Sequence, residues 1–481
     1  MTRDAIDLHA FDRDVRRAAG RVEQLRALLA LGTREARDDA RAFDPFEGVR
    51  HTATMTSYKT LLEQTPSVLD VPLRDALLRW VHELLQARVG FELALADADA
   101  AHSLDPRLAP SRLAAAEEPR AVREAREASG APEGAVRADI AAHTHTGAMA
   151  TMIAAPDVSR AAAALERAAD LAAPVAAVRK ERRERRFEAA RRLGLAHPYA
   201  LASNAKIDVG ALARSFLDAS EPLAVELLKT AQKQADARWY ASSAVQNFLA
   251  RDAREGWPAY LTQRWLDDVF KALAPRGADA GRLPEALGGA SFLRAAAAWG
   301  ASWKNAGAPR SMPFALARDP YPVPAFRFGL AMAVAVADPE LQRRVLELPA
   351  RTAKAQSRLL RRSMFHAARA LAARAVFATE ETVTPAMFEE LTARLFGAPL
   401  PAALRDAWPD PRISDPARFL AMLGTRAFVA SLVERFDDDW FRNPRAGTHL
   451  TSLACGPAFD AETLPDGAVA GTARAFEEAL G

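Results

Sequence analysis

The stretch VPLRDALLRWVHELLQARVGFELAL, residues 71–95, decides the fold class of this chain. Its apolar residues recur three and four positions apart, which is the spacing of one face of an α-helix. A strand would alternate apolar and polar residues at every second position. The pattern therefore predicts an amphipathic helix whose apolar face holds Leu73, Leu77, Trp80, Val81, Leu84 and Leu85.

The same periodicity recurs over most of the 481 residues. Further helices are expected at 15–31, 158–193, 209–248, 261–273, 291–304, 351–377, 385–396 and 416–436. Aromatic residues make up only 7% of the chain, and alanine, leucine and arginine are abundant, which favours helix over sheet. We expect an all-α fold in two lobes, residues 1–200 and 201–481, with a cleft between them.

Charge and composition narrow the choice of partners and location. Lys and Arg number 64 against 61 Asp and Glu, and the two signs are interspersed, which disfavours binding to nucleic acid. The single cysteine, Cys455, is expected to be buried and excludes an internal disulfide. The charged N-terminus is unlike a secretory signal, and the longest uncharged apolar run, 328–337, is shorter than the roughly 20 residues that span a bilayer. A cytoplasmic location without membrane contact is expected.

Histidine patterns offer little for a metal site. His82-Glu83 begins like the zinc motif His-Glu-x-x-His, but Gln86 stands where the second histidine belongs. We interpret His82 and Gln86 as part of an exposed polar stripe on the helix. His143 and His145 are two residues apart, a spacing that converges on a strand but diverges on the helix that their alanine-rich surroundings predict. They are outside candidates for metal ligands.

Two charged segments suggest local roles. The stripe formed by Arg358, Arg362, His366 and Arg369 is either an exposed helix face or the cationic wall of a cleft that attracts acidic peptide groups. The run FDDDWFRNPR, residues 436–445, is interpreted as a helix cap in which the aspartates also pair with Arg442 or Arg445. The Gly-rich phosphate-binding loops and the Gly-x-Ser-x-Gly elbow of serine hydrolases do not occur in the sequence.

The stretch RAAAAWGASWK, residues 294–304, carries a resemblance to a known family. From about residue 180 onward the order of features resembles the thimet oligopeptidase and oligoendopeptidase F family (M3 type) of helical zinc peptidases. An arginine-rich helix that ends in Leu193-Gly194 is similar to one in that family, and the tail from 443 to 476 is similar to its closing segment. The family signature reads His-Glu-Phe-Gly-His, whereas this chain reads Ala297-Ala298-Trp299-Gly300-Ala301.

The resemblance implies a peptidase body without its metal. Both histidines and the general-base glutamate are alanines, and the region 319–328 has proline or valine where the family's third ligand stands. The family's glycine- and tyrosine-rich loop also has no counterpart. Because methyl groups do not bind zinc, no water is activated and no carbonyl is polarised. We therefore expect no cofactor and a non-catalytic protein that binds a peptide or protein partner in its helical cleft.

Two alternatives stay open. One is a zinc-dependent oligopeptidase whose site has moved to His143, His145 or His82. The other is an α-helical scaffold unrelated to peptidases.

Overall fold

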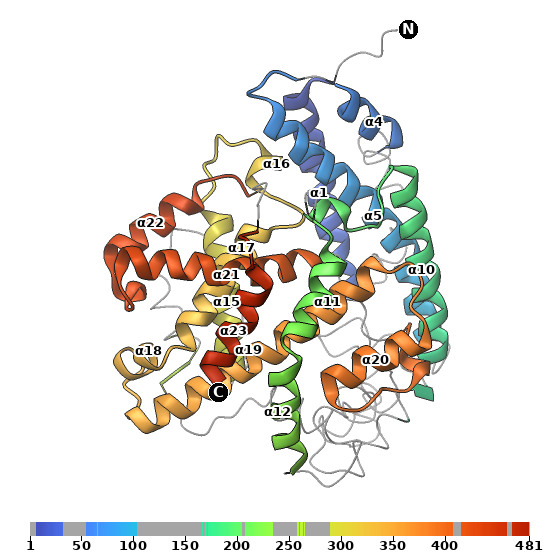
Figure 1. Ribbon diagram of the computed structural model, residues 1–481. Helices are drawn as coiled ribbons and strands as arrows, with labels where there is room; N and C mark the ends of the chain where they lie inside the picture. The colour runs from blue at the N-terminus through green and yellow to red at the C-terminus, as the bar shows by residue number, and fades with distance from the viewer. Residues whose placement is uncertain are drawn as a thin grey trace, which may run out of the picture. The chain divides into compact units, whose positions relative to one another are not determined.

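The computed structural model describes residues 6–31, 54–64, 66–102, 172–203, 207–233, 289–406, 415–458 and 464–480, with short pieces at 166, 169–170, 257–258, 260–262 and 264. Throughout these ranges all regular secondary structure is helical (Figure 1). The prediction of an all-α fold is confirmed.

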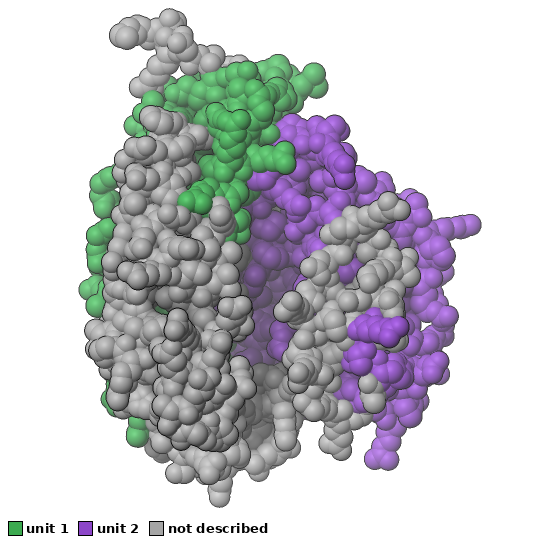
Figure 2. Space-filling model, turned by 180° about the vertical axis from the view of Figure 1, so that it is seen from behind, with its two compact units in different colours: residues 1–198, 234–244, 380–410 green, residues 199–233, 245–379, 411–481 purple. Residues whose placement is uncertain are grey.

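The chain divides into two compact units (Figure 2). Unit 1 holds the described residues within 1–198 and 380–410, and unit 2 holds those within 199–233, 245–379 and 411–481. The sequence led us to expect continuous lobes divided at residue 200. The segment 380–410 instead belongs with unit 1, because its short helix at 402–404 packs on the helix at 172–192. The cleft between the lobes stays a prediction.

Unit 1 is built around the helix that the opening stretch predicts. This helix, α5 (Val71–His102), packs against α1 (Leu8–Leu31), α4 (Met55–Glu63) and α10 (Ala172–Arg192). The unit also contains α20 (Pro385–Phe396) and η4 (Ala402–Leu404). Because three helices cover α5, burial extends around most of its circumference, well beyond the stripe of Leu73, Leu77, Val81 and Leu84.

Unit 2 has a central group of long helices. Here α17 (Val323–Val336) packs against both α15 (Gly289–Ala306) and α21 (Asp415–Phe436), and α19 (Ala350–Thr379) packs against α21 and α11 (Val209–Ala219). The remaining elements are η3 (Ala200–Ser203), α12 (Glu221–Lys233), α16 (Phe314–Ala317), α18 (Pro339–Arg344), η5 (Trp440–Arg442), α22 (Pro444–Ala454) and α23 (Ala468–Leu480). Alanine is frequent on α15 and α17, and small side chains allow helices to approach closely.

Several helix ends follow local signals. In α20, Thr384 caps the first turn through its hydroxyl, Pro385 occupies the first position, and Gly397 ends the helix with φ 76°. The pattern predicted at 209–248 is broken after Ala219. There Ser220 donates its hydroxyl to the carbonyl of Phe216, and α12 starts afresh at Glu221.

One described helix, α21, has the length and apolar composition needed to cross a membrane. In its most apolar window 56% of the residues are buried inside the structure, which is also how core helices behave. Phe419 and Leu423 of α21, for example, are almost fully buried. The cytoplasmic location stays a prediction.

Candidate functional site

The contact between α15 and α17 is made through glycine. A Cβ atom added to Gly300 would lie 2.5 Å from the carbonyl oxygen of Phe328 and 2.9 Å from the Cα of Gly329. A Cβ atom on Gly329 would overlap the carbonyl oxygen of Ala297. The two backbones therefore touch, and any larger side chain at either position would push the helices apart.

This close contact fixes which side of α15 faces the interior. Phe292, Ala296, Trp299 and Trp303 are spaced three and four apart, and each is buried. The indole rings of Trp299 and Trp303 lie against each other, with centroids 5.0 Å apart. Buried aromatic residues, interrupted by Ala296, thus run along one side of α15.

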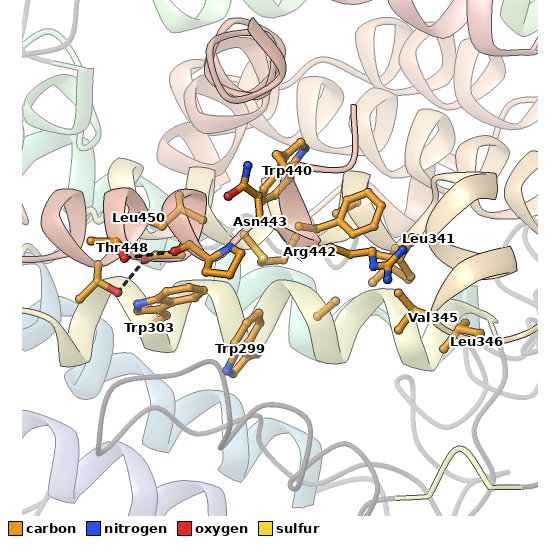
Figure 3. Close-up of a pocket in the computed structure, with 18 of the residues that line it drawn as sticks. Trp299, Trp303, Leu341, Val345, Leu346, Trp440, Arg442, Asn443, Thr448 and Leu450 are labelled. Carbon is orange, nitrogen blue, oxygen red and sulfur yellow. Dashed lines mark hydrogen bonds between the residues drawn. The ribbon is translucent and has the colours of Figure 1, made fainter. Parts of the chain in front are cut away.

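A pocket of about 570 Å³ opens over these residues within unit 2. Trp299 and Trp303 form one wall, and Trp440 and Asn443 lie across from them (Figure 3). The remaining walls come from α17, α18 and α22. The full lining is Phe292, Ala296, Trp299, Trp303, Met332, Ala335, Val336, Leu341, Val345, Leu346, Trp440, Phe441, Arg442, Asn443, Pro444, Gly447, Thr448, Leu450 and Thr451.

The lining carries few polar groups, and most of them serve the fold. Asn443 caps α22 by accepting a hydrogen bond from the backbone N–H of Arg445 at 3.0 Å. Thr448 and Thr451 donate their hydroxyls to carbonyls one turn earlier in α22. The side chain of the exposed Arg442, in contrast, makes no hydrogen bond or ion pair with the described part of the chain. Its guanidinium lies at the Leu341 end of the pocket, away from Trp303 and Thr448 (Figure 3).

One further polar group in the wall is unsatisfied. Trp303 is only 3% exposed, and its buried Nε1–H has no acceptor among the described residues. Buried donors in folded proteins are nearly always paired with protein or water. The indole N–H of Trp303 is therefore an unsatisfied buried donor on the helix that forms this wall.

The three alanines that the sequence comparison aligned with the peptidase signature lie elsewhere on α15. Ala298 is exposed, and Ala297 and Ala301 are half-buried, whereas Trp299 and Gly300 are buried. Two positions along a helix correspond to about 200° of rotation, so Ala297 and Trp299 point in nearly opposite directions. None of the three alanines carries a donor atom for zinc, so these positions do not fit the metal of the family.

The four residues of the predicted cationic stripe on α19 differ in burial and in hydrogen-bond partners. Arg369 is only 2% exposed and donates to the carbonyl of Leu217, the hydroxyl of Ser220 and the carboxylate of Glu221. It holds the junction of α11 and α12 against α19 and has no free side for a cleft.

The other three residues of the stripe differ in their surroundings. Arg358 is exposed and donates to the carbonyl of Leu480 at 3.1 Å. Burial, followed by the charge of Arg358, lowers the pKa of Arg362. Burial, followed by the charge of Arg369, lowers the pKa of His366 to about 4. A cleft-lining role stays a prediction for Arg358 and Arg362.

The interpretation of His82 as part of an exposed stripe is wrong. His82 and Gln86 are 0% exposed, and the Gln86 amide donates to the carbonyl of Arg186 on α10. The error arises because α10 covers the face of α5 that the sequence pattern leaves polar. Burial, then the charges of Arg79 and His197, lower the pKa of His82 to about 3. His82 is thus a neutral core residue at neutral pH.

Other metal candidates receive no support from the described part of the chain. His143 and His145 lie outside the described residues. Within the described ranges, no group of three or more His, Cys, Asp or Glu side chains is arranged to hold a metal ion. Cys455, expected to be buried, is exposed at the end of α22.

The aspartate run at 437–439 also behaves differently from the prediction. Asp439 lies 3.5 Å from Arg344 of α18, and neither Arg442 nor Arg445 takes part in this pair. The cap of α22 is supplied by Asn443. Trp440 and Phe441, which the sequence did not indicate as site residues, line the pocket. Their only signal was an aromatic pair next to a helix cap.

Comparison with known proteins found no matching family model and no significant match among curated proteins or solved structures. The fold and the pocket are therefore interpreted from their own geometry. The relationship to the zinc peptidases rests on the sequence resemblance alone.

Proposed function

We propose that this protein is a non-catalytic relative of the thimet oligopeptidase and oligoendopeptidase F family that binds a peptide, or an extended segment of a protein partner, without cleaving it. The observation that carries the proposal is the aromatic pocket on α15, the helix on which the family places its zinc signature. Three tryptophans line this pocket from two facing walls, and they offer the large apolar contact area that dominates binding energy in peptide recognition.

The chemistry of α15 supports binding without hydrolysis. A zinc peptidase needs two imidazoles and a third ligand to hold the metal, together with a carboxylate to activate water. Ala297, Ala298 and Ala301 provide none of these groups. The relocated site of the alternative hypothesis gains nothing from His82, because a residue that is 0% exposed cannot reach a substrate.

The proposal is tested by combining binding with two assays for chemistry. A pool of labelled peptides with varied apolar residues is titrated with the protein and followed by fluorescence anisotropy, with and without a metal chelator. The protein's zinc content and its cleavage of an internally quenched oligopeptide are measured on the same preparation. We expect saturable binding that the chelator does not change, no stoichiometric zinc and no cleavage. Zinc at one equivalent per chain together with cleavage would refute the proposal, and so would the absence of binding.

A further inference from the structure

The walls of the pocket on α15 suit a bulky apolar group. Its volume of about 570 Å³ falls within the range of small-molecule pockets, roughly 300–1,000 Å³. Trp299, Trp303 and Trp440 contribute ring surfaces to the lining, and apolar side chains such as Met332 and Leu341 line the rest of the pocket. Stacking and edge contacts with such rings favour an aromatic or large aliphatic side chain as the occupant.

The only charge that the described lining residues contribute to the pocket is positive. Among the described lining residues, Arg442 is the only charged one, and none is acidic. Asp439, three residues before Arg442, forms an ion pair with Arg344. Asn443 caps α22, which begins at Pro444, and the positive end of this helix dipole adds to the field of the nearby guanidinium. The pocket therefore attracts an anionic group at its Arg442 end.

The same charge excludes another occupant of aromatic pockets. Rings arranged around a cavity commonly bind quaternary ammonium groups through cation–π attraction. A guanidinium at the pocket wall repels such a cation. The ligand that fits has an apolar body and a negative charge.

The other end of the pocket offers hydrogen bonds. Thr448 and Thr451 donate their hydroxyl protons within α22, and each hydroxyl oxygen keeps lone pairs that can accept a hydrogen bond. A peptide group provides both an N–H and a carbonyl, whereas the chain of a fatty acid provides neither. The combination favours a peptide over a free amphipathic acid.

We propose that the pocket on α15 binds the C-terminal residue of a peptide, with its aromatic or large aliphatic side chain among the tryptophans and its α-carboxylate on Arg442. The preceding peptide group then lies toward Thr448 and Trp303. This inference rests on the proposed function and names the part of the peptide that is recognised.

The test changes the peptide first, so that protein folding is not affected. Three peptides share one sequence: the first ends in tryptophan with a free carboxylate, the second ends in tryptophan as the amide, and the third ends in alanine with a free carboxylate. Binding to the full chain is followed by fluorescence anisotropy. We expect the amide and the alanine peptide each to bind about tenfold more weakly, the size of effect that follows from losing one charge-assisted hydrogen bond or one large apolar contact.

A pair of protein variants then assigns the carboxylate contact. Arg442→Gln should weaken binding of the free acid about tenfold and bring it to the level of the amide, because the two changes remove the same interaction. Arg445→Gln is the matched control. Arg445 is also exposed, lies three residues away and does not line the pocket, so this variant should keep the preference for the acid.

The outcomes separate this inference from the proposed function. Equal binding of the acid and the amide overturns the inference but leaves peptide binding intact. Binding of decanoate at the Arg442 end, with none of the three peptides bound, overturns it in favour of a free amphipathic acid. If no peptide of any sequence binds, the proposed function fails and the inference fails with it.

Discussion

The contact of α15 with α17 predicts that Gly300→Ala destabilises unit 2. The added Cβ atom would lie 2.5 Å from the carbonyl oxygen of Phe328 and 2.8 Å from the Cγ of Met332. Carbon and oxygen atoms in ordinary contact are more than 3 Å apart, so α15 must move away from α17. Backbone atoms provide two of the three nearest contacts, and they cannot rotate aside as a side chain can.

The size of the effect follows from two opposing terms. Overpacking a well-packed core costs typically 1–3 kcal/mol, and a clash with backbone is expected near the upper end, about 3 kcal/mol. Alanine in place of glycine inside a helix contributes about 1 kcal/mol in the other direction. The net prediction is a loss of about 2 kcal/mol in the free energy of unfolding.

The control is Gly424→Ala in α21, which belongs to the same unit. There the nearest atoms to an added Cβ belong to the Arg327 side chain at 3.7 Å, which is ordinary contact. This variant should therefore be as stable as the unsubstituted chain or more stable, by up to about 1 kcal/mol. Urea denaturation followed by circular dichroism compares the two, with tryptophan fluorescence as a second probe. If Gly300→Ala is as stable as Gly424→Ala, the inferred backbone contact does not exist.

Three further predictions concern buried charges and histidines. Lys304→Met should lower the free energy of unfolding by about 2–3 kcal/mol, because the ammonium donates to the carbonyls of Ala454, Gly456 and Pro457. Hydrogen exchange at the end of α22 should become faster, and an unchanged exchange rate there would contradict this role of Lys304. The free energy of unfolding should fall as pH drops from about 6.5 toward 3, because His82 in the fold, with its pKa near 3, stays neutral while the histidine of the unfolded chain takes up a proton. In an acid denaturation series, His82→Gln should flatten this slope by up to about 1.4 kcal/mol per pH unit. Arg369→Leu should lower the free energy of unfolding, measured by urea denaturation, by about 2–3 kcal/mol. This is less than for a fully buried ion pair, because the side chain of its partner Glu221 is 33% exposed. An unchanged free energy of unfolding would mean that the ion pair of Arg369 with Glu221 does not hold α11 and α12 to α19.

Helical periodicity was sufficient to predict the fold class and several individual helices. The predicted segments 291–304, 351–377 and 385–396 correspond to α15, α19 and α20 within a few residues. Each has a clear apolar stripe, and α20 also has its capping threonine and terminal glycine in sequence. Local signals were enough there because helix formation and termination depend on neighbouring residues.

The same reasoning failed where burial depends on a distant partner. His82 was assigned to solvent because its own helix already has an apolar face, but α10, about 100 residues later, covers the polar face as well. Arg369 was assigned to a cationic stripe, but it reaches the end of α11 about 150 residues earlier. No pattern within a single helix contains that information.

The pocket was unpredictable for a related reason. Its walls come from three segments, around 292–303, 332–346 and 440–451, and each looks ordinary alone. Trp299 and Gly300 were singled out for their resemblance to a metal-binding helix. The structure gives both residues a further physical role, since Gly300 allows the approach of α17 and Trp299 forms the wall of the pocket.

Native mass spectrometry of the purified full chain mixed with a peptide ending in a free C-terminal tryptophan tests the central claim most directly, because one spectrum shows the protein, any metal and the peptide together. We predict the mass of the chain plus one intact peptide, with no zinc in the complex. A zinc-bound chain accompanied by shortened peptides, or a chain that never carries peptide, would contradict the claim that this helical body binds peptides without cleaving them.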